Sequence, residues 1–210
     1  MNPEEYFWWE WWVSFFIAVG TIGAVVIALF GQKFQSKIFP PYLTLSLLHP
    51  EGERSVVELT PPPGKGDKRK EEARYYHLKV SNERRWSPAN QVQVFLMRIE
   101  EPGPDGEFRI NWQGDLPMRW RHQEISPVTK TIGPSADCDI CSIIKGKGVS
   151  LLPLITPFNL DVDKRNPFNL IVSFQARSNQ VDSSIVRVQI AWDGMWDEGD
   201  QKHLVVKILK

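Results

Sequence analysis

The feature that most constrains this chain is an uncharged run of 20 residues, Trp11–Phe30. Its apolar side chains are interrupted only at Ser14, Gly20, Thr21 and Gly23. With a rise of about 1.5 Å per residue, a helix of this length spans about 30 Å, which is the thickness of a bilayer's hydrocarbon core. A helix that is apolar on every side has no face for water. The run therefore predicts a transmembrane helix over residues 11–31, preceded by a short acidic tail over residues 1–10.

Both flanks of the run carry residues that favour membrane surfaces. Tryptophan rings and lysine side chains prefer the headgroup region, and the flanks hold Trp8, Trp9, Trp11, Trp12 and Lys33. A cleaved secretory signal would instead have a basic first segment and an Ala-x-Ala cleavage site, and neither is present. A soluble core helix would show a shorter uncharged run. We therefore expect an uncleaved anchor with these five residues as its interfacial belt.

The cations beside the anchor predict its orientation. Lys33 and Lys37 follow the run, whereas no lysine or arginine precedes it. Cationic flanks stay in the cytoplasm, so we expect the N-terminus outside and the C-terminal domain in the cytoplasm. The chain has only two cysteines, too few for the disulfide framework of a small secreted domain.

A stripe of small residues, Gly20, Ala24 and Ala28, recurs every four positions along the anchor. Such a stripe lets two transmembrane helices approach closely, which would favour a homo-oligomer or a partner helix. Glycine and alanine are also common in membrane helices that associate with nothing. Both interpretations stay open at this point.

A change of pattern follows a connector over residues 32–41, because Pro40-Pro41 blocks further helix. From residue 42 to 210, short apolar runs with period-two alternation are separated by glycine and proline turns, as in half-buried antiparallel strands. The sequence thus predicts a mainly β chain, with an antiparallel β-sandwich behind one N-terminal transmembrane helix. The expected strands are Tyr42–Leu48, Ser55–Thr60, Tyr75–Ser81, Gln91–Ile99, Glu107–Trp112, Met118–His122, Asp139–Ile144, Val149–Ile155, Leu170–Arg177, Ser184–Trp192 and Leu204–Leu209.

Two neighbouring segments, Tyr76–Asn82 and Pro88–Val94, have a polar corner followed by an A-x-x-V-x-V strand. This arrangement resembles the strand–loop–strand core of bacterial membrane-anchored immunoglobulin-like sandwich domains. The resemblance implies an immunoglobulin-like sandwich and carries over no functional residue. The inter-sheet cysteine pair of antibody domains is missing, because Cys138 and Cys141 are close neighbours in sequence.

Cys138 and Cys141 form the one motif, C-x-x-C, that could carry metal or redox chemistry. Zinc needs about four ligands, usually from a second pair or from spaced histidines, and the four histidines of the chain are scattered. In a regular strand, residues three apart also point to opposite faces. We therefore expect no metal or cofactor and keep the pair as the only candidate ligands.

Two loops imitate ligand-binding motifs without their spacing. Gly64–Lys70 lacks the G-x-x-x-x-G-K-[ST] pattern of a phosphate loop, and we expect a solvated loop whose cations could touch lipid headgroups. Asp161–Asn166 begins like a calcium loop but lacks its glycine and its distal glutamate. Neither loop predicts a site.

The connection after Trp192 is the most distinctive surface feature. It combines Trp192 and Trp196 with four carboxylates and exceeds the length of a hairpin turn. Exposed loop tryptophans are typical anchors of protein interfaces, although both rings could instead fold back over the end of the sandwich. We predict a partner contact at Trp192 and Trp196.

No catalytic signature is present in the sequence, whether nucleophile elbow, zinc helix or glycine fingerprint. Because lysine plus arginine and aspartate plus glutamate both number 25, the charge also gives no indication of nucleic-acid binding. We therefore expect a non-enzymatic interaction or sensing module at the bilayer, with a protein partner or a second copy. The alternative is a membrane effector of a bacterial stress or defence system, whose helix oligomerises and perturbs the bilayer.

Overall fold

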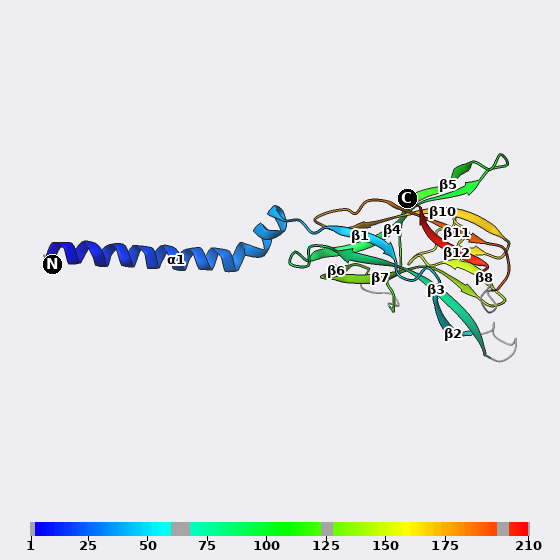
Figure 1. Ribbon diagram of the computed structural model, residues 1–210, viewed down its shortest axis with the longest axis horizontal. Helices are drawn as coiled ribbons and strands as arrows, with labels where there is room; N and C mark the ends of the chain where they lie inside the picture. The colour runs from blue at the N-terminus through cyan, green and yellow to red at the C-terminus, as the bar shows by residue number, and fades with distance from the viewer. Residues whose placement is uncertain (1–2, 60–67, 123–127, 197–201, 210) are drawn as a thin grey trace. The chain divides into compact units, whose positions relative to one another are not determined.

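The N-terminal unit of the computed structural model, Met1–Pro40, consists of one helix, α1 (Pro3–Ile38) (Figure 1). The structure describes residues 3–59, 68–122, 128–196 and 202–209. Proline is well tolerated at the first helical position, and the residue before a proline avoids helical backbone, so α1 begins at Pro3 and ends before Phe39-Pro40. Within it, Trp8–Ala28 is long and apolar enough to cross a membrane, and no part of this stretch is buried.

The helix is longer than the sequence predicted. Most of the expected acidic tail (residues 1–10) is helical from Pro3, and the expected connector (residues 32–41) is helical through Ile38. The prediction ended the helix where the apolar run ends. Glutamine, lysine and glutamate are nonetheless good helix formers, and they continue the helix on both sides of the run.

The second unit, Pro41–Lys210, contains two six-stranded sheets in which every pairing is antiparallel. The first sheet has the order β1-β3-β7-β8-β9, with β2 also paired to β3, and the second has the order β12-β11-β10-β4-β5, with β6 also paired to β4. The predicted β-sandwich behind one apolar helix is confirmed. The first sheet comprises β1 (Leu43–Leu47), β2 (Glu53–Leu59), β3 (Arg69–Asn82), β7 (Ser135–Ile144), β8 (Gly148–Leu151) and β9 (Asp163–Lys164). The second comprises β4 (Ala89–Pro102), β5 (Phe108–Pro117), β6 (Lys130–Ile132), β10 (Phe168–Arg177), β11 (Val186–Trp192) and β12 (Leu204–Leu209).

The core lies between the two sheets and is built by the alternating strands. Val92, Val94 and Leu96 of β4 are fully buried, as are Val188 and Ile190 of β11. These are the faces that the period-two pattern predicted. Each aliphatic side chain buried in this way contributes roughly 1.5–3 kcal/mol to folding.

The structure differs from the prediction at Met118–His122, at two short strands and at the end of the Gly64–Lys70 loop. Met118–His122 is not a regular strand, because only Met118 and Trp120 form isolated bridges, to Pro153 and Cys138. The short strands β6 and β9 were not predicted, since three and two residues are too few to show alternation. The structure describes only the end of the Gly64–Lys70 loop, where Arg69 and Lys70 belong to β3, and residues 64–67 lie outside the described part.

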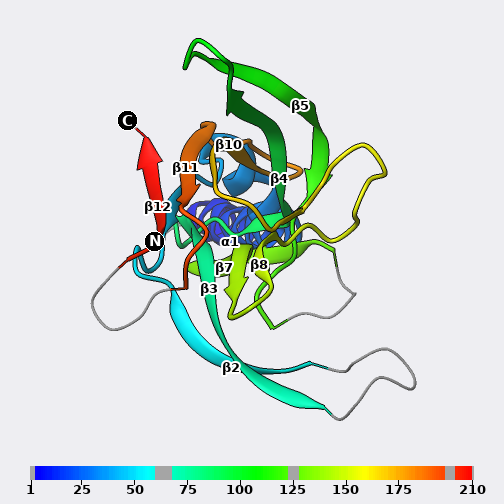
Figure 2. The same cartoon turned by 90° about the vertical axis from the view of Figure 1, so that its right-hand side faces the viewer.

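The strand register defines two opposite ends of the sandwich. The proximal end is the one where Leu43 of β1 pairs with Asn82 of β3, and it also holds the β6–β7 and β10–β11 turns. The distal end holds the β7–β8 turn and the end of β11, where Trp192 pairs with Phe168 and Leu204. Two long hairpins, β2–β3 and β4–β5, reach out on opposite sides of the sandwich (Figure 2).

The side chain of Asn82 ties the proximal end together. Its Oδ1 accepts hydrogen bonds from the backbone N–H groups of Tyr42 (3.2 Å) and Arg84 (3.1 Å). Its Nδ2 donates to the backbone carbonyl of Ser87 at 2.8 Å. Asn82 is 2% exposed, so this buried amide satisfies backbone groups of both the incoming chain and the β3–β4 loop. This is the polar corner that the sequence pattern indicated.

Candidate functional site

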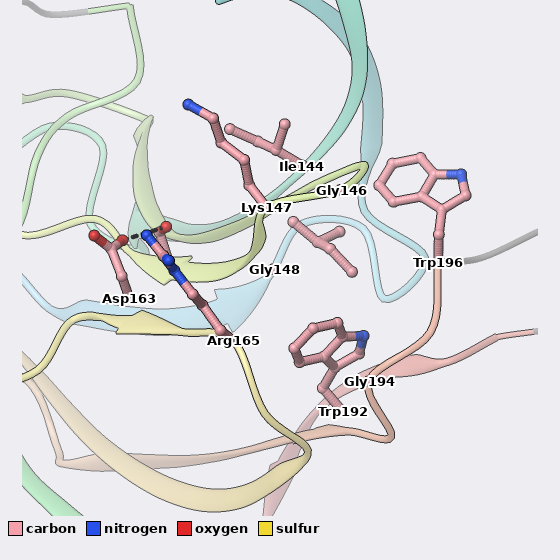
Figure 3. A pocket seen from close by; sticks show the side chains of 11 residues that line it. Ile144, Gly146, Lys147, Gly148, Asp163, Arg165, Trp192, Gly194 and Trp196 are labelled. Atoms are coloured by element: carbon pink, nitrogen blue, oxygen red, sulfur yellow. Dashed lines mark hydrogen bonds between the residues drawn. The ribbon is translucent and has the colours of Figure 1, made fainter. Parts of the chain in front are cut away.

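A pocket of about 620 Å³ opens at the distal end of the sandwich (Figure 3). Pockets of 300–1,000 Å³ are the usual size for ligand or side-chain binding. This one is lined by residues of β7, the β7–β8 turn, β8, β9, the β9–β10 connection, the end of β11 and the β11–β12 connection. They are Ile143, Ile144, Gly146, Lys147, Gly148, Ser150, Asp163, Arg165, Trp192, Gly194 and Trp196.

Strand pairing brings the cationic side of the pocket together. In β8, Val149 pairs with Lys164 and Ser150 with Asp163, so the β7–β8 turn and the residue after β9 become neighbours. Gly148 has a φ of +104°, and a Cβ at this position would lie 2.4 Å from the carbonyl oxygen of Lys164. Only glycine allows β9 to approach so closely. Lys147 and Arg165 therefore line one pocket although they are 18 positions apart in sequence.

The two predicted tryptophans form the opposite side. Trp192 is only 7% exposed, its ring packs 6.1 Å from that of Phe168, and its Nε1 donates a hydrogen bond to the Met195 carbonyl at 2.7 Å. Trp196 is partly buried against the core. Figure 3 shows both indole rings on one side of the hollow and the side chains of Lys147 and Arg165 on the other. Both rings are thus folded back and form one wall of the pocket.

The charges around the pocket are unevenly compensated. Asp163 accepts a hydrogen bond from the Ser150 hydroxyl at 2.5 Å. Lys147 and Arg165 are both exposed and have no ion pair among the described residues. Three of the four carboxylates noted in the sequence, Asp197, Glu198 and Asp200, lie outside the described part of the chain. Among the described lining residues, two cations without an ion pair and the carboxylate of Asp163 thus lie opposite an aromatic wall.

The fourth carboxylate, Asp193, stabilises the loop that carries the tryptophans. One oxygen accepts the backbone N–H of Met195 at 3.0 Å, and the other lies 2.7 Å from Nδ1 of His203. The hydrogen bond from His203, reinforced by the Met195 N–H, lowers the pKa of Asp193 below its ordinary value. The carboxylate thus joins the two sides of the β11–β12 connection.

A second hollow, of about 220 Å³, lies over a charged network that the sequence did not reveal. His77 and Asp139 are 4% and 6% exposed, and the imidazole Nδ1 lies 2.8 Å from a carboxylate oxygen of Asp139. Arg119 approaches the other oxygen at 3.5 Å, while Arg121 pairs with Glu53 at 2.6 Å. Each acid of this network meets a cation or an imidazole, as buried charges require. The network therefore joins β2, β3 and β7, and its cations are already engaged.

The C-x-x-C pair lies in the core. Cys138 and Cys141 are both fully buried, without a disulfide. A β-bulge shifts the register, because Tyr76 pairs with Cys141 and His77 with Asp139, so both thiols reach the interior although they are three positions apart. Burial raises the pKa of each thiol, and Asp139 adds to the effect at Cys138. Among the described residues, no group of three or more His, Cys, Asp or Glu side chains is placed to hold a metal ion.

The predicted membrane residues all belong to α1. Trp8, Trp9, Trp11 and Trp12 are between 46% and 64% exposed. Gly20, Ala24 and Ala28 are exposed as well, and a Cβ added at Gly20 would meet nothing within 4 Å. The side chain of Lys33 lies outside the described part of the chain. The stripe of small residues is therefore open along the helix.

Comparisons with known proteins give no further guide to the site. No protein-family model, no curated protein and no solved structure matches this chain. The function has to be inferred from the geometry of the described residues.

Proposed function

We propose that this chain is a single-pass membrane protein whose β-sandwich is a non-enzymatic module for binding a partner protein. The anchor is the apolar stretch Trp8–Ala28 of α1. We place the N-terminus outside and the sandwich in the cytoplasm, as the lysines after the apolar run favour. The two antiparallel sheets and the Asn82 corner support an immunoglobulin-like sandwich.

The observation that carries the proposal is the distal pocket. Ligand-binding sites are usually concave and largely preformed, with a few polar groups that fix orientation. Here the Trp192–Trp196 connection is held in place by its own hydrogen bonds, and Gly148 fixes the opposite side. The pocket thus exists before any partner arrives.

The lining indicates the chemistry of the partner. Lys147 and Arg165 offer two cations without an ion pair among the described residues, and the indoles offer apolar and aromatic surface. An acidic segment that also carries an apolar or aromatic side chain complements both sides. Charge complementarity of this kind sets specificity and the rate of association more than it sets affinity.

Photocrosslinking from the pocket tests the partner. A benzophenone amino acid replaces Met195, which is 54% exposed, and the full chain is irradiated in its membranes. We expect a discrete adduct whose yield falls by about tenfold in Lys147→Glu/Arg165→Glu, as charge reversal at an interface predicts. Lys145→Glu is the matched control, since Lys145 lies in the same turn but pairs with Glu72. Equal yields in all three proteins would refute the pocket as the interface.

Protease treatment of intact cells and of inverted vesicles tests the orientation. We expect the sandwich to be digested only in the inverted vesicles. Digestion from outside intact cells would show that the proposed orientation is wrong. The pocket proposal is tested separately, by the photocrosslinking experiment.

The membrane-effector alternative predicts a different observation. If the helices assemble through the open stripe and perturb the bilayer, induced expression lowers the membrane potential, and Gly20→Ile/Ala24→Ile abolishes the effect. Ile22→Leu is the control, because Ile22 is exposed at 65% but lies outside the stripe. An unchanged membrane potential on induction would exclude the effector and leave the binding module.

A further inference from the structure

The proximal end of the sandwich carries a second set of aromatic side chains, which face outward. Trp86 in the β3–β4 loop is 60% exposed, and Tyr42 is 55% exposed. Arg85, directly before Trp86 in the same loop, is exposed and has no ion pair among the described residues. Together, Tyr42, Arg85 and Trp86 form what we call the proximal surface.

Hydrogen bonds hold this surface rigidly. Glu83 donates its backbone N–H to the Tyr42 carbonyl at 2.9 Å, and Ser87 donates to the Arg84 carbonyl at 2.9 Å, which closes a tight turn around residues 85 and 86. Asn82 donates its backbone N–H to Pro134 at 3.0 Å and so ties the loop to the β6–β7 turn. The backbone that carries the exposed indole is thus already ordered, which lowers the conformational cost of binding.

The proximal surface follows the helix after a short connection. Only Phe39-Pro40-Pro41 separates the last helical residue, Ile38, from Tyr42, and three residues span at most about 10 Å. The helix runs ten residues past Ala28, which adds about 15 Å along its axis. The longest strands have 14 residues, or about 46 Å, so the chain path from the anchor is much shorter to the proximal end than to the distal end.

We propose that the proximal surface docks on the phospholipid headgroup layer, with the rings of Trp86 and Tyr42 in the interface and the guanidinium of Arg85 on a lipid phosphate. Tryptophan and tyrosine favour this layer because their rings are apolar with one polar edge. Guanidinium groups bind phosphate oxygens in a fork geometry. The inference rests on the anchoring part of the proposed function and goes beyond it, because it assigns the sandwich its own lipid contact.

Depth-dependent fluorescence quenching tests the docking in the full chain. The protein is reconstituted in phosphatidylcholine liposomes with an environment-sensitive dye on Ser135→Cys, an exposed residue at the proximal start of β7. The two native cysteines are fully buried, so the dye reacts at the introduced cysteine. A second sample carries the dye on Lys147→Cys at the distal end. With headgroup spin-labelled lipid, we expect strong quenching at 135 and almost none at 147.

Substitutions at the surface identify the contact. Trp86→Ala/Arg85→Glu should remove most of the quenching at position 135. Ile110→Ala should leave it unchanged, since Ile110 is 54% exposed but lies on β5. Alkaline carbonate, which leaves only membrane-spanning proteins in the liposomes, tests the anchor separately. If the protein resists carbonate but quenching is equal at 135 and 147, the docking is wrong and the anchor stands. Extraction by carbonate would overturn the anchor, and the docking with it.

Discussion

The two ends of the sandwich use the same residue type in opposite ways. At the distal end, Trp192 is 7% exposed and its N–H is bonded within its own loop, while at the proximal end Trp86 is 60% exposed on a tight turn. The distal ring is part of the core and shapes a cavity, whereas the proximal ring adds nothing to the core. The indole of Trp192, bonded to its own loop, builds a pocket. The indole of Trp86, carried on a closed turn, is presented at the surface.

The largest expected difference between the ends is in stability. Trp192→Ala removes a ring that packs against Phe168, and we expect a loss of about 3–5 kcal/mol in the free energy of unfolding. Trp86→Ala should change it by less than about 0.5 kcal/mol. Urea unfolding of the full chain in detergent, followed by near-ultraviolet circular dichroism, measures both values. Similar losses of unfolding free energy in the two variants would show that the two indoles do not differ in their contribution to stability.

The next effect concerns what holds the proximal surface rigid. Asn82→Ala leaves the backbone N–H groups of Tyr42 and Arg84 without their acceptor, so we expect a loss of roughly 2–3 kcal/mol, as for unsatisfied buried groups. Asn179→Ala is the control, because the exposed amide of Asn179 donates to the side chain of Gln91 and its loss should cost less than about 0.5 kcal/mol. The same unfolding measurement compares them. A cost at Asn82 no larger than that at Asn179 would show that the corner does not hold this end.

The smallest effect is electrostatic and belongs to the distal end. The hydrogen bond from His203 lowers the pKa of Asp193 in the folded state, so its stabilising contribution is present above the unfolded pKa and is lost as the pH falls through the lowered one. We expect His203→Gln to raise the pKa of Asp193 towards its ordinary value, as measured by carboxyl-carbon NMR titration.

An internal control for this titration lies nearby in the same domain. The pKa of Glu51 is lowered by Lys202, so it should stay low in His203→Gln and rise only in Lys202→Met. If both carboxyl groups shift together in either variant, the local hydrogen bonds are not the cause.

Much of the fold could be read from the sequence, because period-two alternation is a local signal. Val92, Val94 and Leu96 lie on the core face as their spacing predicted. The helix ends could not be read in the same way, since Gln32 to Ile38 are helical without being uniformly apolar. An uncharged run shows where the apolar residues end, but the helical backbone can continue beyond them.

The candidate site was predicted only on its aromatic side. Trp192 and Trp196 stand out in the sequence, whereas Lys147 and Arg165 look like ordinary turn residues. They line the same pocket because β8 pairs with the two-residue strand β9, and no local pattern reports such a pairing. The bulge opposite Tyr76 and His77 was equally hidden, and it is what buries both cysteines on one strand.

The order in which the strands enter the sheets has a consequence for synthesis. The chain gives β1–β3 to the first sheet, β4–β6 to the second, β7–β9 to the first and β10–β12 to the second. The first sheet cannot be completed before β9 (Asp163–Lys164) is made, and the second cannot be completed before β12 (Leu204–Leu209). Pairings between distant parts of a chain form slowly, and unfinished sheet edges invite association with other chains. The nascent domain would pass through this vulnerable period on the ribosome with its N-terminal helix already made, because α1 precedes β1 in the chain.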